Sequence, residues 1–534
     1  MRVGPAPPHP LARQSMVAMR DGVRLATDVY LPDDGTDAGP TLLIRLPYDK
    51  CGEIAFVPQI AECAIARGYR VVAQDVRGKF RSEGERLLFA NEGRDGYDTI
   101  DWIVQQPWSD GIVGMLGDSY YGYTQWAALA TGHPALRAIV PGVTGTQLGA
   151  LPRMAADGRT GEVEAGMQRL YGTTFFHGSD IYFWEPDWQR RPYADSVEEF
   201  FEAVGFRSDA WDMWFPHPVV VDRFPDGNPL DARPVPTLLR LGWWDNCGRW
   251  QWEDVAEIAR RSAWALNTYM LIESRDHDGN LLEEGRPSQE HGGREMERAL
   301  DPTLEFFDVF LRNAAPPESI PRVRWNLAHT EGWQVCESWP PGGIEPRELH
   351  LTTDGRLAPE PGPGGTELQW THDPDDLVPS PYPATFNFLT VYPDEQEWSE
   401  RPDVLAFSGE PVQRDLDLAG AVRLRGTFGS DGPVLDLFAR LLDVWPDGSA
   451  RLITRGQLRV IEPGAGVEVE IELGQVGYRL QAGHALRLHV ASSEFPEFLP
   501  QPGTGENPWA AVQTRPNLQT LQEGARLTLG VLDG

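Results

Sequence analysis

The sequence predicts an α/β protein with a helical insertion and a separate all-β domain in its C-terminal part. Short apolar runs alternate with amphipathic segments over residues 1–145 and again over 231–316, as in βαβ units around a largely parallel sheet. This alternation stops over residues 146–230, where aromatic side chains are crowded together. From 317 to 534 helical periodicity disappears and short alternating strands follow one another.

Composition limits the classes of function. A chain of 534 residues is long enough for three or four domains. Its formal net charge of −32 repels phosphate backbones, so we expect no nucleic-acid partner. The sequence has neither the roughly 18 consecutive apolar residues of a membrane span nor the apolar core of a secretory signal. These features predict a cytoplasmic protein that has no membrane partner.

The cysteines show no spacing typical of a disulfide framework or a zinc site. Cys51, Cys63, Cys247 and Cys336 contain no C-x-x-C pair, which favours structural thiols in a reducing compartment. The sequence also lacks H-E-x-x-H and any tight cluster of His and Asp. We therefore expect no metal and no cofactor. A homodimer is compatible with the sequence, which does not determine the oligomeric state.

Each element of the α/β part has a local signal. Apolar runs predict strands at 17–23, 24–31, 41–46, 69–75, 111–118, 136–141, 235–242 and 265–273. Amphipathic spacing predicts helices at 54–67, 95–106, 123–130 and 295–312. The first two strands flank Asp21-Gly22, a strong hairpin signal.

The insertion at 146–230 reads as a helical segment over the active edge of the sheet. Its aromatic residues are Tyr171, Phe175, Phe176, Tyr182, Phe183, Trp184, Trp188, Phe200, Phe201, Trp211, Trp214 and Phe215. Most of these rings are expected to form the core of the insertion itself. Some should face a cleft, because ligand pockets are mostly apolar with a few polar groups.

The C-terminal part predicts a β-sandwich of the jelly-roll kind. Its alternating strands are expected at 322–328, 348–352, 421–428, 435–444, 467–473 and 484–491. Asp354-Gly355 and Asp447-Gly448 mark turns between them. Many short strands separated by Gly- and Pro-containing turns are typical of this architecture.

Ser119 lies in the stretch Gly117-Asp-Ser-Tyr-Tyr-Gly122, between a buried strand and an Ala-rich helix. A sharp strand-to-helix turn that exposes a serine is a nucleophile elbow. The strict Gly-x-Ser-x-Gly pattern is not met, because position 121 is Tyr and the second glycine comes one place later. The alternative is an ordinary βα turn in which the serine caps the helix.

Asp245 and His277 follow two later strands, and together with Ser119 they give the order Ser–Asp–His of an α/β-hydrolase triad. A serine hydroxyl needs a neighbouring imidazole to take its proton, and the imidazole needs a carboxylate to orient it. His133 and His291 are alternatives for the base. His133 precedes the aspartate and His291 lies well beyond the last strand, so we favour His277. Asp276 and Asp278 flank His277 but would need an awkward reversal to orient it.

Motifs along nearly the whole chain resemble the CocE/NonD hydrolases, which include cocaine esterase, X-Pro dipeptidyl-peptidase and α-amino-ester or glutaryl acylases. The matching stretches are Arg45-Leu-Pro-Tyr48, Asp75-Val-Arg-Gly78, Gln106-Pro-Trp108, Gly117-Asp-Ser119-Tyr-Tyr-Gly122, Gly242-Trp-Trp-Asp245, Trp339-Pro-Pro341, Ala439-Arg-Leu441 and Ala491-Ser-Ser493. The offset Gly122 fits the elbow of this family.

The resemblance implies a role for each site residue. Ser119 would be the nucleophile, Asp245 the orienting acid and His277 the base. The oxyanion hole would combine the phenol of Tyr48 with the backbone N–H of Tyr120. One stretch departs from the family, whose histidine usually follows Gly-Pro-Trp-Ser. Here the histidine follows Glu273-Ser-Arg-Asp.

The expected function is that of a serine hydrolase that cleaves small-molecule esters, or amides, through an acyl-enzyme. X-Pro dipeptidyl-peptidase and β-lactam side-chain acylase activities are alternatives within the family, and a non-catalytic binding protein is an alternative of another class. Asp245 is followed by Asn246-Cys-Gly-Arg249, without a carboxylate for a substrate ammonium. We therefore expect neutral acyl groups, with Cys247 as a small apolar wall. Glu162 or Glu164 could still supply an ammonium site.

Overall fold

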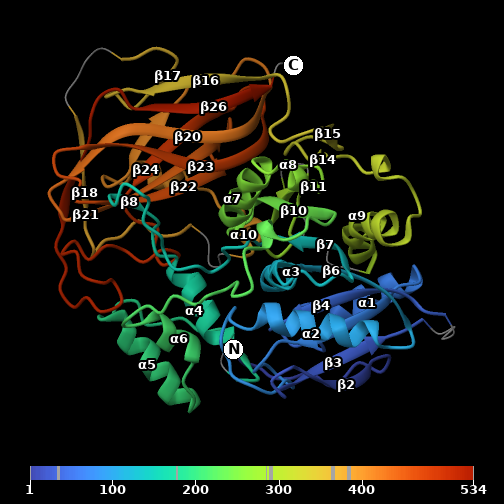
Figure 1. The fold of residues 1–534 in the computed structure, drawn as a ribbon. Helices are drawn as coiled ribbons and strands as arrows, with labels where there is room; N and C mark the ends of the chain where they lie inside the picture. The colour runs from blue at the N-terminus through green and yellow to red at the C-terminus, as the bar shows by residue number, and fades with distance from the viewer. Residues whose placement is uncertain are drawn as a thin grey trace.

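The N-terminal part of the chain is built on a ten-stranded mixed sheet, and the C-terminal part is all-β (Figure 1). The computed structural model describes residues 2–32, 37–175, 178–283, 286–287, 293–362, 367–381 and 386–532. Across the sheet, the strands are β15 (Gln334–Cys336), β14 (Val323–Trp325), β11 (Thr268–Asp276), β10 (Thr237–Trp244), β7 (Leu136–Gly142), β6 (Ser109–Asp118), β4 (Gly39–Leu46), β5 (Arg70–Asp75), β3 (Arg24–Tyr30) and β2 (Arg13–Ala18).

The central strands of this sheet are parallel and covered on both faces. Strands β4, β5, β6, β7, β10, β11 and β14 pair in parallel, whereas β2, β3 and β15 pair antiparallel at the edges. All six residues of β5 are buried, as expected for a strand that has no solvent face. Adjacent residues such as Leu42 and Leu43 belong to different apolar clusters because strand side chains alternate in direction.

Helices form the two covering layers. On one face, α1 (Val57–Ala66) and α9 (Gly293–Arg312) contact each other and the sheet. On the other face lie α2 (Glu92–Val104), α3 (Tyr120–Ala130), α7 (Gly248–Ala259) and α8 (Ser262–Ala265). The sequence predicted α1, α2, α3 and α9 but not α7. Among the described helices, none has the length and hydropathy to cross a bilayer.

The strand ends bring the expected site residues to one edge of the sheet. Strand β6 ends at Asp118, β10 at Trp244 and β11 at Asp276, so Ser119, Asp245 and His277 each follow directly. The sequence predicted that β10 and β11 would end at 242 and 273. Both strands run on, β10 into Trp243-Trp244 and β11 into Ser274-Arg-Asp276, and these extensions still pair across the ladder, as Trp244 does with Asp276.

The insertion contains the helices α4, α5 and α6 (Figure 1), which pack around aromatic side chains. Its elements are β8 (Thr160–Gly161), α4 (Gly166–Phe175), β9 (Ile181–Tyr182), α5 (Tyr193–Val204), α6 (Asp209–Trp214) and the 3₁₀ turn η1 (Pro229–Asp231). The rings of Tyr193, Phe200 and Trp211 lie in one buried cluster, which also includes Leu499 and Trp509 from the C-terminal part. Phe176 lies outside the described residues.

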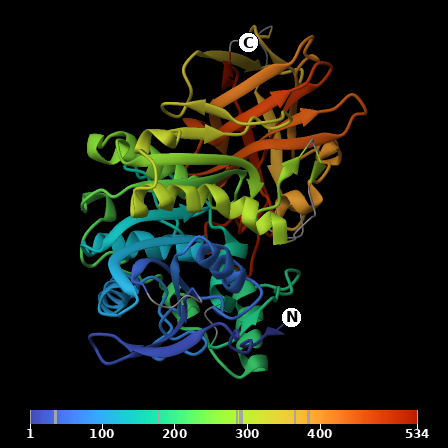
Figure 2. The ribbon, with the colours of Figure 1, turned by 90° about the vertical axis from the view of Figure 1, so that its right-hand side faces the viewer.

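Two antiparallel sheets form most of the C-terminal part, which lies against the α/β part in both views (Figures 1 and 2). One sheet contains β17 (Leu357–Ala358), β16 (Ile344–Leu351), β26 (Arg526–Leu532), β20 (Leu416–Ser430), β25 (Asn517–Leu521) and β18 (Leu368–His372), with β23 (Val467–Leu480) paired to β20. The other contains β19 (Leu405–Ser408), β24 (Ala485–Ala491), β21 (Val434–Val444), β22 (Ala450–Ile461) and the short strand β8 of the insertion.

The contact between the two parts is close. A Cβ on Gly477 of β23 would lie 2.6 Å from a ring carbon of Trp243 on β10, so only a glycine fits there. The Trp244 indole N–H donates to the Leu452 carbonyl at 3.0 Å. The strand predicted at 322–328 was expected to belong to the C-terminal part. Its observed counterpart, β14, pairs instead with β11 in the ten-stranded sheet.

Candidate active site

The Ser119 turn has a strained backbone. Ser119 has φ 58° and ψ −124°, a conformation that L residues rarely adopt. Its side chain makes no capping hydrogen bond to α3, which removes the alternative of a simple helix cap. Strain of this kind costs about 1–3 kcal/mol and persists only where the surrounding structure enforces it.

Two glycines permit this turn. Gly117 has φ +142°, and a Cβ there would lie 2.0 Å from Cδ2 of Tyr121. The Tyr121 ring therefore occupies the space that a side chain at position 117 would need. A Cβ on Gly122 would lie 2.6 Å from Cγ2 of Thr144, which explains why the second glycine of the motif falls at 122. Position 121 carries a ring that packs back over the turn.

His277 and Asp245 meet across neighbouring strand ends. The imidazole Nδ1 lies 2.7 Å from Oδ1 of Asp245, whose side chain has no exposed surface. The same Oδ1 accepts the backbone N–H of Cys247 at 3.0 Å. Because a carboxylate only accepts hydrogen bonds, Nδ1 carries the proton and Nε2 is left as the proton acceptor.

The surroundings of His277 stabilise the imidazolium that forms when Nε2 takes up a proton. Burial opposes protonation, but contacts with Cys247 and with the Asp245 carboxylate outweigh it and hold the pKa of His277 well above its ordinary value. The ring of Phe386 lies over the imidazole with 4.9 Å between ring centroids. This phenylalanine belongs to the C-terminal part of the chain, and no local sequence signal predicted its contact with the site.

Tyr48 lies beside the serine at the end of β4. Burial raises the pKa of Tyr48 above its ordinary value, while hydrogen bonding to the Ser119 side chain and the Tyr120 backbone acts in the opposite direction. The phenol therefore stays protonated at neutral pH and can donate a hydrogen bond. Its ring makes edge contacts with Tyr121 and with Phe175 of the insertion, at centroid distances of 6.0 and 5.6 Å.

The alternative residues are not part of this arrangement. The His133 ring contacts Tyr97 at a centroid distance of 4.5 Å, and its nearest acidic partner is Asp101. His291 lies outside the described residues. Asp276 accepts from the Asn280 side chain and from the backbone N–H of Leu389, and Asp278 is exposed. Neither flanking aspartate is the partner of His277 Nδ1 in the structure.

Cys247 contacts the imidazole as well as lining the site. Asp245, Cys247 and His277 each place a potential metal-ligand atom within 4.8 Å of the others. A metal would compete with the bond that joins the aspartate to the imidazole. It would also need a thiolate, whereas burial raises the pKa of Cys247 and favours the thiol. The donor set thus suits proton transfer better than metal binding.

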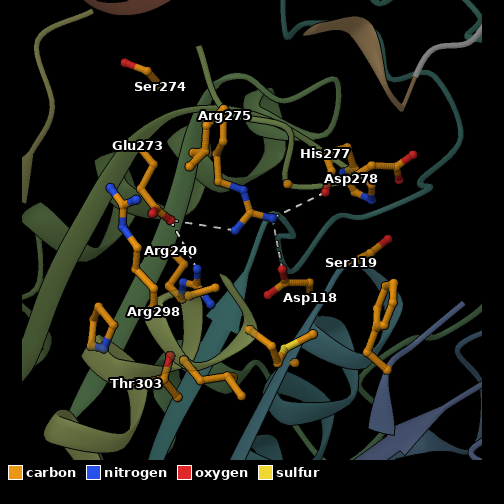
Figure 3. A pocket seen from close by; sticks show the side chains of 18 of the residues that line it. Asp118, Ser119, Arg240, Glu273, Ser274, Arg275, His277, Asp278, Arg298 and Thr303 are labelled. Carbon is orange, nitrogen blue, oxygen red and sulfur yellow. Dashed lines mark hydrogen bonds and ion pairs between the residues drawn. The ribbon is translucent and has the colours of Figure 1, made fainter. Parts of the chain in front are cut away.

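A cavity of about 1350 Å³ opens at the carboxyl ends of the strands and is lined by Tyr48, Ser119 and His277. Phe175 of the insertion and Phe386 of the C-terminal part complete the wall around these residues. Figure 3 shows a charged group beside them, formed by Asp118, Arg240, Glu273 and Arg275. We did not predict this group, although the unusual residues before His277 were visible as a departure from the family motif.

Both halves of the chain match models of one family. The model described as X-Pro dipeptidyl-peptidase (S15 family) matches residues 21–279. The model of the X-Pro dipeptidyl-peptidase C-terminal non-catalytic domain matches residues 315–528. Two solved structures share the fold: an α-amino acid ester hydrolase (23% identity, TM-score 0.80, 97% of this chain and 96% of that chain) and an aminopeptidase from a marine sediment Thaumarchaeota archaeon (22%, 0.79, 99% and 98%).

A curated relative extends the match through the entire molecule. Cocaine esterase from Rhodococcus sp. (strain MB1 Bresler) is 30% identical, with 93% of each chain covered. A putative serine esterase of Mycobacterium bovis is 24% identical, with 91% of each chain covered. Because sequence identity of this extent spans both the α/β part and the β part, the chain belongs to the CocE/NonD family of serine hydrolases.

Proposed function

We propose that this protein hydrolyses small esters with neutral acyl groups through an acyl-enzyme on Ser119. The observation that carries the proposal is the bond between His277 Nδ1 and the buried Asp245, which leaves Nε2 as a proton acceptor in the cavity that Ser119 also lines. The names of the esterase relatives support esters as the substrates.

The reaction would proceed in two steps, acylation of Ser119 and hydrolysis of the acyl-enzyme. Nε2 of His277 takes the Ser119 proton as Oγ attacks the ester carbonyl, and the carbonyl electrons move onto oxygen. Tyr48 O–H and Tyr120 N–H would donate to that oxyanion, a type of stabilisation that acts on charge as it develops. The imidazolium then gives its proton to the leaving alkoxide. Water repeats the sequence against the acyl-enzyme and releases the acid.

The parallel strand order and the Ser–Asp–His order support an α/β-hydrolase core in residues 1–145 and 231–316. We assign residues 146–230 as its cap and 317–534 as a jelly-roll domain, except that β14 and β15, at 323–325 and 334–336, add strands to the sheet of the core. Phe175 from the proposed cap and Phe386 from the proposed jelly roll both line the cavity, which would give each of them a role in forming the apolar wall around the acyl group.

Charge pairing supports a neutral acyl group. Glu162 lies 2.6 Å from Arg153 and 3.4 Å from Arg249. Glu164 lies 2.7 Å from Arg169. The two acids that might have served an ammonium therefore already have cationic partners. A substrate ammonium that entered without a carboxylate partner would lose hydration at a cost of several kcal/mol.

The test combines covalent labelling with substrate comparison. A fluorophosphonate probe should label the wild-type protein, and peptide mapping should place the label on Ser119. In a panel of p-nitrophenyl esters and Xaa-Pro-anilides, the esters should show the higher kcat/KM. Labelling at another residue would overturn the assigned nucleophile, and a preference for the anilides would establish the peptidase alternative.

A further inference from the structure

Arg275 connects two parts of the proposed catalytic machinery that come from different strands. It is only 5% exposed and lies on β11, two residues before His277. Its guanidinium donates to Oδ2 of Asp118 at 3.1 Å and to the backbone carbonyl of His277 at 3.4 Å. Figure 3 shows the side chain extended between these two groups. One planar cation thus contacts both the residue before Ser119 and the segment that carries the base.

The Asp118 end of this connection is held in place by packing. A Cβ on Gly142 would lie 2.0 Å from Oδ1 of Asp118, so the carboxylate lies directly against that glycine. Gly142 in turn accepts the backbone N–H of Ser119 at 2.9 Å. The Asp118 carboxylate is therefore packed against the same residue that accepts the backbone N–H of the strained turn.

The charge of Asp118 is also significant for chemistry. This carboxylate is adjacent in sequence to the nucleophile, where negative charge develops during acyl transfer. Arg275 and Arg240 more than offset the cost of burial, so that the pKa of Asp118 is lowered and the carboxylate is ionised; His277 contributes in the same direction. Without its cation, Asp118 would oppose an oxyanion and would attract the proton-bearing form of His277.

We propose that Arg275 is a positioning residue, which holds the His277 segment against the Ser119 turn and neutralises the carboxylate of Asp118, the residue that precedes the nucleophile. The inference rests on the proposed function. It assigns a role to the sequence Glu273-Ser-Arg-Asp that replaces the usual family motif before the histidine. Arg275 acts through Asp118 and His277 and does not need to touch the substrate.

Other charged groups lie near Arg275, Asp118 and His277, and they are the same in every variant of the test. From β11 itself, Glu273 lies 3.7 Å from Arg275, and the same carboxylate lies 3.2 Å from Arg240 on β10. Asp245 and Cys247 face His277 from the end of β10 and the start of α7. Further titratable neighbours are Tyr121 on α3, Tyr48 after β4, Asp276 and Asp278 on either side of His277, and Arg298 of α9, which lines the same cavity (Figure 3).

The experiment measures the rate of phosphonylation of Ser119 against pH in four variants. The acid limb of this pH profile is the rise in rate as His277 loses its proton. Arg275→Met leaves Asp118 without its cation, which stabilises the imidazolium and shifts the acid limb to higher pH. Asp118→Asn leaves Arg275 without its anion and shifts the limb to lower pH. The double variant restores the wild-type charge balance and should return the limb toward its original position. A purely structural role would slow these variants without moving the limb in opposite directions.

Arg275→Lys separates the clamp from the charge. Lysine keeps the cation but not the planar guanidinium, whose Nη2 contacts Asp118 and the His277 carbonyl while its Nε donates to the Asp276 carbonyl at 3.2 Å. The limb should stay in place while the maximal rate falls by up to about 100-fold, the cost that a 1 Å misplacement of a catalytic group can carry. Arg459→Met is the control, since it removes a half-buried arginine that pairs with Asp436 at 2.7 Å in the C-terminal part. Its acid limb should equal that of the wild type.

The outcomes distinguish this inference from the function on which it rests. If Ser119 is labelled but the acid limb is the same in Arg275→Met, Asp118→Asn and the wild type, Arg275 is not the positioning residue while the hydrolase assignment stands. If the wild type is not labelled at Ser119, both proposals are overturned. Should Arg275→Met fail to fold by circular dichroism, Asp118→Asn and Arg275→Lys decide the question.

Discussion

The imidazole of His277 and the carboxylate of Asp245 lie 2.7 Å apart although 32 positions separate them in the sequence. The pairing exists because β10 and β11 are parallel neighbours, so their carboxyl ends lie side by side. The carboxylate both orients the ring and stabilises its charge. Two measurable consequences follow, one for rate and one for pH dependence.

Asp245→Asn should lower kcat by about 10⁴, as loss of the orienting carboxylate does in a serine protease triad. The residual activity should titrate at lower pH. Asp245 holds the pKa of His277 above its ordinary value, so removal of the negative charge makes the imidazole easier to deprotonate. The acid limb of kcat/KM therefore moves toward lower pH. A limb that moves toward higher pH would show that another group controls the titration.

Ser119→Ala should abolish covalent labelling and lower kcat by about 10⁶, the usual cost of losing a serine-hydrolase nucleophile. Ser274→Ala is a matched control because Ser274 lines the same cavity and its hydroxyl is bonded to Asn326. Steady-state kinetics and intact mass after fluorophosphonate treatment provide the measurement. Retention of a tenth of wild-type activity in Ser119→Ala would exclude Ser119 as the nucleophile.

Tyr48→Phe removes a proposed oxyanion donor and leaves the ring that packs on Phe175. Loss of one such donor typically costs about 10²–10³ in kcat. KM should change little, because the interaction strengthens only as charge forms on the oxygen. Tyr171→Phe removes a hydroxyl from a nearby ring of the insertion and should leave kcat intact. An unchanged kcat with a raised KM in Tyr48→Phe would make Tyr48 a pocket wall.

Gly117→Ala should disrupt the serine turn because the new Cβ would lie 2.0 Å from the Tyr121 ring at a backbone φ of +142°. We expect a lower melting temperature and a large loss of labelling rate. Gly22→Ala is the control, since Gly22 has φ +88° but nothing within 4 Å of an added Cβ. That variant should lose only about 1 kcal/mol of stability to backbone strain and label normally. Equal effects in both variants would show that the Tyr121 contact is unimportant.

Neutral acyl esters should be cleaved with higher kcat/KM than matched esters with a free α-amine, measured below the pKa of that amine. Glu162 and Glu164 are both paired with arginines, so neither carboxylate is left without a cation and available to an ammonium. Asp278 is the exposed acid on the cavity wall next to His277. A preference for the amino ester that disappears in Asp278→Asn would contradict the proposed acyl specificity and locate the ammonium site.

Local sequence patterns determined most of the α/β elements and the order of the proposed site residues. Apolar runs located β4, β5, β6 and β7 to within one or two residues at most ends, because these strands are buried on both faces. The pattern failed where burial and polarity diverge. Strand β11 continues into buried polar residues that extend its pairing with β10, and β14 is too short to show which sheet it joins.

For the proposed site, the sequence alone determined the residue types, their chain order and their positions after parallel strands. Only the tertiary structure decided their partners. Phe386 over His277, Arg275 between Asp118 and the His277 carbonyl, and Tyr121 over Gly117 follow from packing and strand register. A local pattern reports the solvent exposure of each residue in its own element, whereas these contacts depend on where separate elements are brought together by the sheet and by the C-terminal part that covers it.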